Sequence, residues 1–218
     1  MSRRKESATR KFKIPQRVAV FPLPNVVLFP KVELPLFIFE PRYRQMLADT
    51  MAGNKLIAIS LFRKDSEKKK DSHPSHEIAG VGYVKAVIEN NDGTSHILLK
   101  GLERVRITSY IQTEPYRVAR VRPIPDEVED TKELRELGLT LRGLFIQRIR
   151  LASERPDQAI ILPKELSDPV TLSHYASFIV SSNPYLKQGI LETTNVNCRI
   201  KHLISLLEEE ISPPGSQN

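Results

Sequence analysis

The chain has 218 residues, a formal net charge of +7 and 40% hydrophobic residues, so it is long enough to bury one large core or two small ones. Its single cysteine excludes an internal disulfide framework and fits a reducing compartment, and no run of about 18 apolar residues indicates a membrane span. In residues 1–14, six basic residues against one acidic residue give +5 of the +7 and leave +2 for residues 15–218. We therefore expect a cytoplasmic protein with a basic, disordered N-terminal tail and a nearly balanced folded part.

A proline-rich apolar stretch, FPLPNVVLFPKVELPLFIFEPRYRQML, organises residues 21–47. Each proline fixes its own φ, removes a backbone donor and restricts the residue before it, so this stretch is not one long helix. The pattern predicts a buried strand over residues 34–39. It then predicts a helix that begins at Pro41, where a missing N–H costs nothing, and ends at Gly53.

Alternating apolar residues predict further strands at residues 17–21, 55–62, 77–89, 94–102, 105–110 and 116–121. Gly80 and Gly82 are expected at bulges or at close approaches of another backbone segment, and Gly101 is expected to break a strand. Asp92 and Gly93 predict a hairpin turn. The charged residues 63–76 have no period and predict an exposed loop.

The hydrophobic period becomes helical after residue 123. A helical stripe follows, and the dipeptides Asp168-Pro169 and Asn183-Pro184 and the polar residues 193–195 predict the starts of three more helices. Strands followed by helices, without alternation, are the α+β pattern. We expect a β-rich subdomain over residues 15–123, a helical subdomain over 124–212 and a disordered tail over 213–218.

No catalytic motif is present, since the sequence contains neither G-x-x-x-x-G-K-[ST] nor G-x-S-x-G. His73 and His76 beside Glu77 are spaced like part of a metal site, but no cysteine or further histidine lies near them, which favours a solvated loop. His174 and Cys198 lie in helical patterns, where a satisfied histidine and a packed thiol are the simpler interpretations. We expect no catalytic residue, no cofactor and no metal.

Five arginines lie on neighbouring predicted strands: Arg104, Arg106, Arg117, Arg120 and Arg122. Alternation places Arg104 and Arg106 on the same face of their strand, and Arg120 and Arg122 on the same face of theirs. These side chains form either a basic patch for phosphate or an acidic peptide, or a solvated face paired with Glu103 and Glu114. The sparse aromatic residues between them favour the solvated face.

Three separated blocks resemble the N-terminal (LON) domain of Lon proteases, which is also found in cereblon-like proteins. They are FPLPNVVLFPKVELPLFIFEPRYRQML, GVGYVKAVIENNDGTSHILLKGLERVRI and LETTNVNCRIKHLISLLEEEI, in that order. The resemblance covers about residues 17–211. It implies a PUA-like, mainly β subdomain (a pseudo-barrel) followed by a C-terminal helical bundle.

In Lon proteases this domain precedes an ATPase module and a Ser-Lys peptidase module, and neither motif set occurs in these 218 residues. The resemblance therefore implies a stand-alone, non-catalytic bacterial protein that binds polypeptide segments or a protein partner in proteolysis or protein quality control. RNA binding is the alternative, because PUA-like folds often bind RNA and the tail is basic. We expect no membrane partner and make no prediction of oligomeric state.

A groove between the two subdomains is the expected site. Exposed apolar and aromatic groups there are expected to take hydrophobic segments, with arginines orienting them. The candidate peptide-binding residues are Arg42, Tyr43, Arg104 and Tyr185, each of which also has a structural interpretation.

Overall fold

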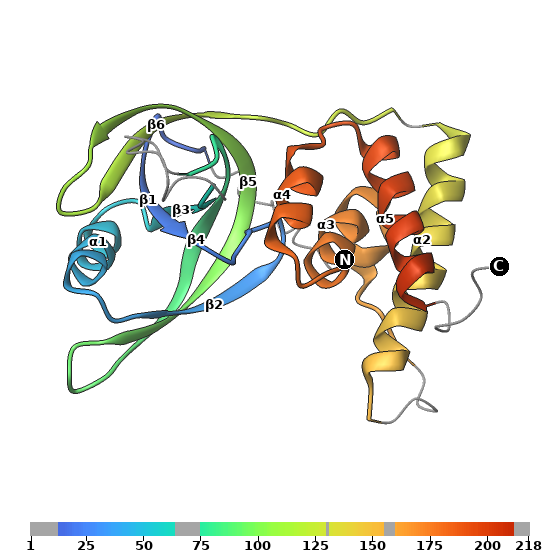
Figure 1. The fold of residues 1–218 in the computed structure, drawn as a ribbon, viewed down its shortest axis with the longest axis horizontal. Helices are drawn as coiled ribbons and strands as arrows, with labels where there is room; N and C mark the ends of the chain where they lie inside the picture. Colours follow the sequence, from blue (N-terminus) through green and yellow to red (C-terminus); the bar gives the residue numbers. More distant parts are fainter. Residues whose placement is uncertain (1–12, 64–74, 130, 155–159, 212–218) are drawn as a thin grey trace, which may run out of the picture.

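The structure is a computed structural model that describes residues 13–63, 75–129, 131–154 and 160–211. It confirms the predicted α+β class: a β half is followed along the chain by a helical half (Figure 1). Most of the predicted basic tail, most of the loop at 63–76 with His73, and the C-terminal tail at 213–218 lie outside the described residues.

The β half is a six-stranded sheet that closes on itself. Its strands are β1 (Arg17–Leu23), β2 (Glu33–Ile38), β3 (Leu56–Leu61), β4 (Ile78–Glu89), β5 (Ser95–Gln112) and β6 (Arg117–Pro123). Strands β1 and β3 pair in parallel, and antiparallel pairs β3–β4, β4–β5, β5–β6 and β6–β1 complete the ring, while β2 extends the sheet from β5. Small and β-branched side chains fill the barrel: Val18, Val20, Ala58, Ala79, Val81, Val105, Ala119 and Val121.

Glycines let the proline-rich stretch lie directly on the barrel wall. A Cβ on Gly80 would lie 1.9 Å from the carbonyl oxygen of Leu28, and a Cβ on Gly101 would lie 2.0 Å from that of Phe29. The predicted close approach at Gly80 is confirmed. The predicted strand break at Gly101 is wrong, because β5 runs unbroken through it and the Gly101 N–H donates to the Val32 carbonyl at 2.8 Å.

Helix α1 (Pro41–Ala52) follows β2 and covers the outer wall of the barrel, on the side away from α2 and α5 (Figure 1). Its buried face is Tyr43, Met46, Leu47 and Thr50. The predicted start at Pro41 and end at Gly53 are confirmed. The helix packs on the side of β3 and β5 opposite to the barrel interior, which gives the β half a second core.

The helical half contains α2 (Lys132–Ala152), a short 3-10 helix at Lys164–Ser167, α3 (Pro169–Ile179), α4 (Pro184–Glu192) and α5 (Val196–Ile211). Side chains of Asp168 and Asn183 cap the N-termini of α3 and α4, as their sequence predicts. Helices α3 and α4 lie between the barrel and the α2–α5 pair (Figure 1). This arrangement places the start of α1 at the end of the molecule far from α2.

Candidate functional site

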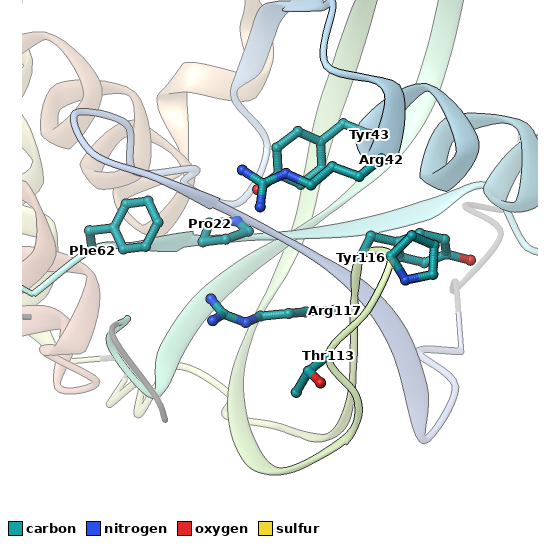
Figure 2. Close-up of a pocket in the computed structure, with 8 residues that line it drawn as sticks. Pro22, Arg42, Tyr43, Phe62, Thr113, Tyr116 and Arg117 are labelled. Atoms are coloured by element: carbon teal, nitrogen blue, oxygen red, sulfur yellow. The ribbon is translucent and has the colours of Figure 1, made fainter. Parts of the chain in front are cut away.

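A hollow of about 140 Å³ lies where α1 begins, and we call it the α1 pocket. Its walls come from four separated parts of the chain: the end of β1, the end of β3, the first turn of α1, and the turn between β5 and β6 (Figure 2). The lining residues are Pro22, Arg42, Tyr43, Phe62, Thr113, Pro115, Tyr116 and Arg117.

The α1 side of the pocket is an aromatic wall with a cation at its edge. The Tyr43 ring packs 4.3 Å from the Phe21 ring and is only 6% exposed, so burial raises the pKa of its phenol. The Arg42 guanidinium lies 4.6 Å from the Tyr43 ring centroid and 2.7 Å from the Glu40 carboxylate. Glu40 therefore offsets most of the charge that Arg42 brings to the pocket.

The facing wall is Tyr116, which is tied to α1. Its hydroxyl donates to Asp49 Oδ2 at 2.7 Å, and its carbonyl accepts from Gln112 Nε2 at 2.9 Å. Burial and the neighbouring Asp49 carboxylate raise the pKa of Tyr116 to about 12, so the phenol stays neutral at physiological pH. The turn between β5 and β6 is thus held at a fixed distance from α1.

Arg117 supplies the cation on the remaining side. Because alternate residues of β6 point to opposite faces, Arg117 turns toward the pocket, away from the side occupied by Arg120 and Arg122. Its guanidinium lies 5.7 Å from the Tyr110 ring centroid. Within the part of the chain that the structure describes, Arg117 has no side-chain hydrogen bond and no carboxylate within ion-pair distance. The pocket therefore holds one positive charge that no neighbour offsets.

The structure brings together two of the four candidates, Arg42 and Tyr43, and separates the other two from them. Tyr185 lies at the start of α4 in the helical half, partly buried against the helical core. Arg104 lies where the two halves meet. It lines the hollow between the halves, as expected, but only 2% of it is accessible.

Arg104 is enclosed by an ion cluster centred on Asp126. The Arg104 guanidinium donates to the Leu191 and Thr193 carbonyls at 2.7 and 3.0 Å and pairs with Asp126. Arg199 of α5 donates to the same carboxylate at 2.7 Å, and His174 of α3 lies 3.0 Å from its second oxygen. Burial opposes ionisation of Asp126, but the hydrogen bonds from His174 and Arg199 and the charge of Arg199 hold its pKa well below the usual range.

The groove expected between the two halves is a hollow of about 540 Å³, and its character differs from the prediction. Charged residues, prolines and small aliphatic groups line it, and its described lining includes no phenylalanine or tyrosine. Three members of the Asp126 cluster, Arg104, Asp126 and His174, form part of its wall. The aromatic pocket that was expected here lies instead at the start of α1.

Sequence reasoning missed Phe62 and Tyr116, and it placed Arg117 in a general basic patch. Only the fold brings residues 22, 43, 62 and 117 together, because parallel pairing of β1 with β3 aligns their ends. One signal was available. Each side of the pocket carries a proline followed by an arginine–tyrosine neighbour pair, Pro41-Arg42-Tyr43 and Pro115-Tyr116-Arg117.

Two further surface features belong to the β half. The first, the outer apolar row, crosses β2, β5 and β4 in register as Phe37, His96 and Ile88, with Phe39 stacked on Phe37 at 5.9 Å. Phe37, Phe39 and Ile88 are 45%, 59% and 66% exposed, which is unusual for three large apolar neighbours.

The second feature, the arginine row, consists of Arg17, Arg120, Arg106 and Arg122. Arg17 lies opposite Arg120, and Arg106 opposite Arg122, on paired strands. Arg106 pairs with Glu77 at 3.2 Å, but the other three have no carboxylate partner among the described residues. The expected neutralisation by Glu103 and Glu114 is therefore not found in the described part of the chain.

The structure adds no support for a metal site at His76 or for a reactive thiol at Cys198. His76 Nδ1 lies 3.2 Å from Glu192, and no cluster of histidine, cysteine, aspartate or glutamate within the described ranges could hold a metal ion. Cys198 is exposed, so its interpretation as a packed thiol is wrong. Across the same ranges, none of the helices has the length and apolarity needed to cross a membrane.

The fold is an α+β domain in which a closed barrel with a covering helix is followed by a small helical bundle. Buried ion pairs join the two halves. The family model of the ATP-dependent protease La (LON) substrate-binding domain matches residues 17–209. The chain belongs to this family.

Relatives and solved structures agree with that assignment. The chain is 26% identical over 202 residues to a Lon protease of Desulfosudis oleivorans and 28% identical over 200 residues to one of Dictyoglomus thermophilum, with 91% of this chain covered in both cases. It spans only about a quarter of the length of these relatives. Its fold is similar to the N-terminal domain of the Mycobacterium avium complex Lon protease, with a TM-score of 0.66, 18% identity, and 88% and 98% of the two chains covered. A Lon N-terminal domain protein from Xanthomonas campestris gives a TM-score of 0.63 at 17% identity, with 87% and 97% covered.

Proposed function

We propose that this chain is a recognition unit that binds polypeptide segments at the α1 pocket without hydrolysing them, in proteolysis or protein quality control. The observation that carries the proposal is the pocket itself, a concave site with aromatic and proline walls and two arginines at its edges. Such walls accept apolar side chains, while arginines fix the orientation of a peptide. Membership of the substrate-binding family supports the same conclusion.

The non-catalytic part of the proposal rests on the chemistry of the site. No described residue of the α1 pocket is a serine, cysteine or histidine, and Tyr116 is held in its neutral form. A nucleophile with an adjacent base is therefore missing from the described lining. The single cysteine supports a reducing compartment, and we place the function in the cytoplasm.

The test is binding of a fluorescently labelled polypeptide that has been reduced and alkylated so that it cannot fold. Phe62→Ser removes apolar surface from the pocket and should weaken binding about tenfold or more, which is about 1.4 kcal/mol. Leu139→Ser is the matched control, because Leu139 is 72% exposed on α2, far from the pocket. Tyr43→Ala is unsuitable, since removing a ring packed on Phe21 would leave a cavity in the core.

Two outcomes would contradict the proposal. If the wild-type protein binds no unfolded polypeptide, the recognition function fails. If Phe37→Ser with Phe39→Ser abolishes binding while Phe62→Ser leaves it unchanged, the outer apolar row, not the α1 pocket, is the binding surface.

RNA binding is the second candidate, and the arginine row favours it. Like charges directly opposite each other destabilise a sheet, so three arginines without carboxylate partners are better explained by an anionic ligand than by the fold. Binding of a single-stranded RNA should weaken steeply with salt, and Arg120→Gln with Arg122→Gln should reduce the slope of log K against log salt by about 1.4. An unchanged slope would exclude the row as the RNA surface, and binding that depends only on residues 1–14 would exclude the fold.

A further inference from the structure

We infer that the α1 pocket is selective for a carboxylate, which Arg117 binds while the aromatic walls hold the adjoining apolar group. The carboxylate is either the C-terminal group of a polypeptide or an aspartate or glutamate side chain within it. This inference rests on the proposed function, because it specifies which part of a bound polypeptide enters the pocket.

The charges around the pocket favour an anionic ligand. Arg42 is already paired with Glu40, with its Nε and a terminal nitrogen 2.9 and 2.7 Å from one carboxylate oxygen. Arg117 has no such partner among the described residues, and no acidic residue belongs to the pocket lining. An anionic group is therefore the complement that this site lacks, and a cationic ligand is disfavoured.

The Arg117 side chain is partly buried, and its Cζ lies 5.7 Å from the centroid of the Tyr110 ring, a contact that restricts the guanidinium. A planar guanidinium binds a carboxylate through two parallel hydrogen bonds, which a lysine ammonium cannot do. In Figure 2, Thr113 lies on the Arg117 side of Pro22, and its hydroxyl has no hydrogen-bond partner among the described residues. It provides a further donor for the same anion.

The size and polarity of the remaining walls fit a single residue with an apolar group. The pocket, at about 140 Å³, is below the range of about 300–1,000 Å³ that takes a drug-sized ligand, so it accommodates a single residue of a longer chain. Pro22, Phe62 and the Tyr43 ring present apolar surface. The Tyr116 hydroxyl donates to Asp49, so it does not serve as a donor for the ligand. The occupant is therefore a carboxylate attached to, or next to, an apolar side chain.

The experiment uses three labelled octapeptides that share an apolar sequence without acidic side chains. One ends in a free carboxylate, one in an amide, and the third ends in an amide but carries one internal glutamate. We expect the wild-type protein to bind at least one carboxylate-bearing peptide about tenfold or more tightly than the plain amide. The peptide with the higher affinity identifies the source of the carboxylate.

The variants assign the effect to Arg117. Arg117→Gln should abolish the preference for the carboxylate, and Arg117→Lys should retain part of it. Arg142→Gln is the matched control, because it removes the same charge from α2, which lies far from the pocket (Figure 1). Unchanged thermal midpoints and circular dichroism confirm that each variant is folded.

The possible failures are distinct. If all three peptides bind the wild-type protein with equal affinity, the carboxylate inference is wrong and the proposed function stands. If none of them binds and the unfolded polypeptide does not bind either, the proposed function fails as well. A carboxylate preference that Arg117→Gln leaves intact would also overturn the assignment.

Discussion

Arg199 Nη1 lies 2.7 Å from Asp126 Oδ1, although Arg199 belongs to the last helix and Asp126 to the segment that leaves the barrel. The same carboxylate pairs with Arg104 of β5. Arg104 and Arg199 are 2% and 1% exposed, so one aspartate offsets two buried guanidinium groups. Asp126 is therefore one of the contacts that orient the helical half on the β half, together with the apolar cluster that Phe29 and Leu61 share with the helices.

Asp126→Asn should strongly destabilise the protein. The substitution leaves two buried cations without a counter-charge, and breaking a buried ion pair costs about 3–5 kcal/mol. Urea unfolding at neutral pH measures the loss. Glu33→Gln is the control, because it removes only solvent-accessible ion pairs, with Lys85 and Lys100, and should cost at most about 1 kcal/mol. A loss at Asp126 no larger than that of the control would show that the cluster does not hold the halves together.

The stability of the protein should fall as the pH drops below about 6.5, and His174 should cause this. Burial lowers the pKa of His174, and the charges of Arg199 and Arg104 lower it further, against the opposing effect of Asp126. Below pH 6.5 the unfolded chain therefore binds a proton that the folded protein does not, so stability is lost between pH 6.5 and the folded-state pKa.

For one histidine, the loss between pH 7.5 and pH 5.5 is at most about 1.4 kcal/mol. His174→Gln should remove this dependence, measured by urea unfolding at both values, while His96→Gln, an exposed histidine on β5, should leave it unchanged. Asp126 also has a lowered pKa, but its contribution is lost only below about pH 3.8 and does not affect this range. An equal pH dependence in wild type and His174→Gln would contradict the assignment.

Local signals predicted much of the fold because they depend on neighbouring residues. Pro41, Asp168 and Asn183 mark helix starts by the chemistry of caps, and Asp92-Gly93 forms the predicted turn, with Gly93 at φ 77°. Alternation predicted that Arg104 and Arg106 share one face, and both lie on the face opposite to Val105 and Ile107, which fill the barrel. It could not show that α4 and α5 cover Arg104, because burial there depends on contacts across 87 or more residues of sequence.

The candidate site was only half predictable for the same reason. The start of α1 in the sequence indicated Arg42 and Tyr43 as candidates. The residues that complete the pocket around them come from the end of β3 and from the turn before β6. Parallel pairing of β1 with β3 has no local signature, since the long connection between them contains both β2 and α1. The location of the pocket thus follows from topology, while its residue types follow from sequence.

Gly101→Ala should destabilise the β half, because the new Cβ would lie 2.0 Å from the Phe29 carbonyl oxygen, and backbone must move to accommodate it. We expect a loss of about 2 kcal/mol or more in the free energy of unfolding. Gly143→Ala is the matched control. Nothing lies within 4 Å of a Cβ at this position in α2, so alanine should stabilise the helix by about 1 kcal/mol. Similar stabilities for the two variants would refute the close packing of the proline-rich stretch on the barrel.

Repulsion within the arginine row should lower the free energy of unfolding at low salt. Arg17 and Arg120 lie opposite each other on β1 and β6, both exposed, and neither has a carboxylate partner among the described residues. Arg120→Gln removes this repulsion and should raise the free energy of unfolding by about 0.2–1 kcal/mol. Arg120→Glu should raise it further, because the cross-strand pair becomes attractive.

The salt dependence separates this effect from a change in packing. Both gains should shrink when NaCl is raised from about 0.02 M to about 0.5 M, since salt screens charges on an exposed strand pair. Urea unfolding of the wild type and the two variants at each concentration gives the comparison. If Arg120→Gln destabilises the protein at low salt, the arginines contribute to the fold, and the argument that they are kept for an anionic ligand is lost.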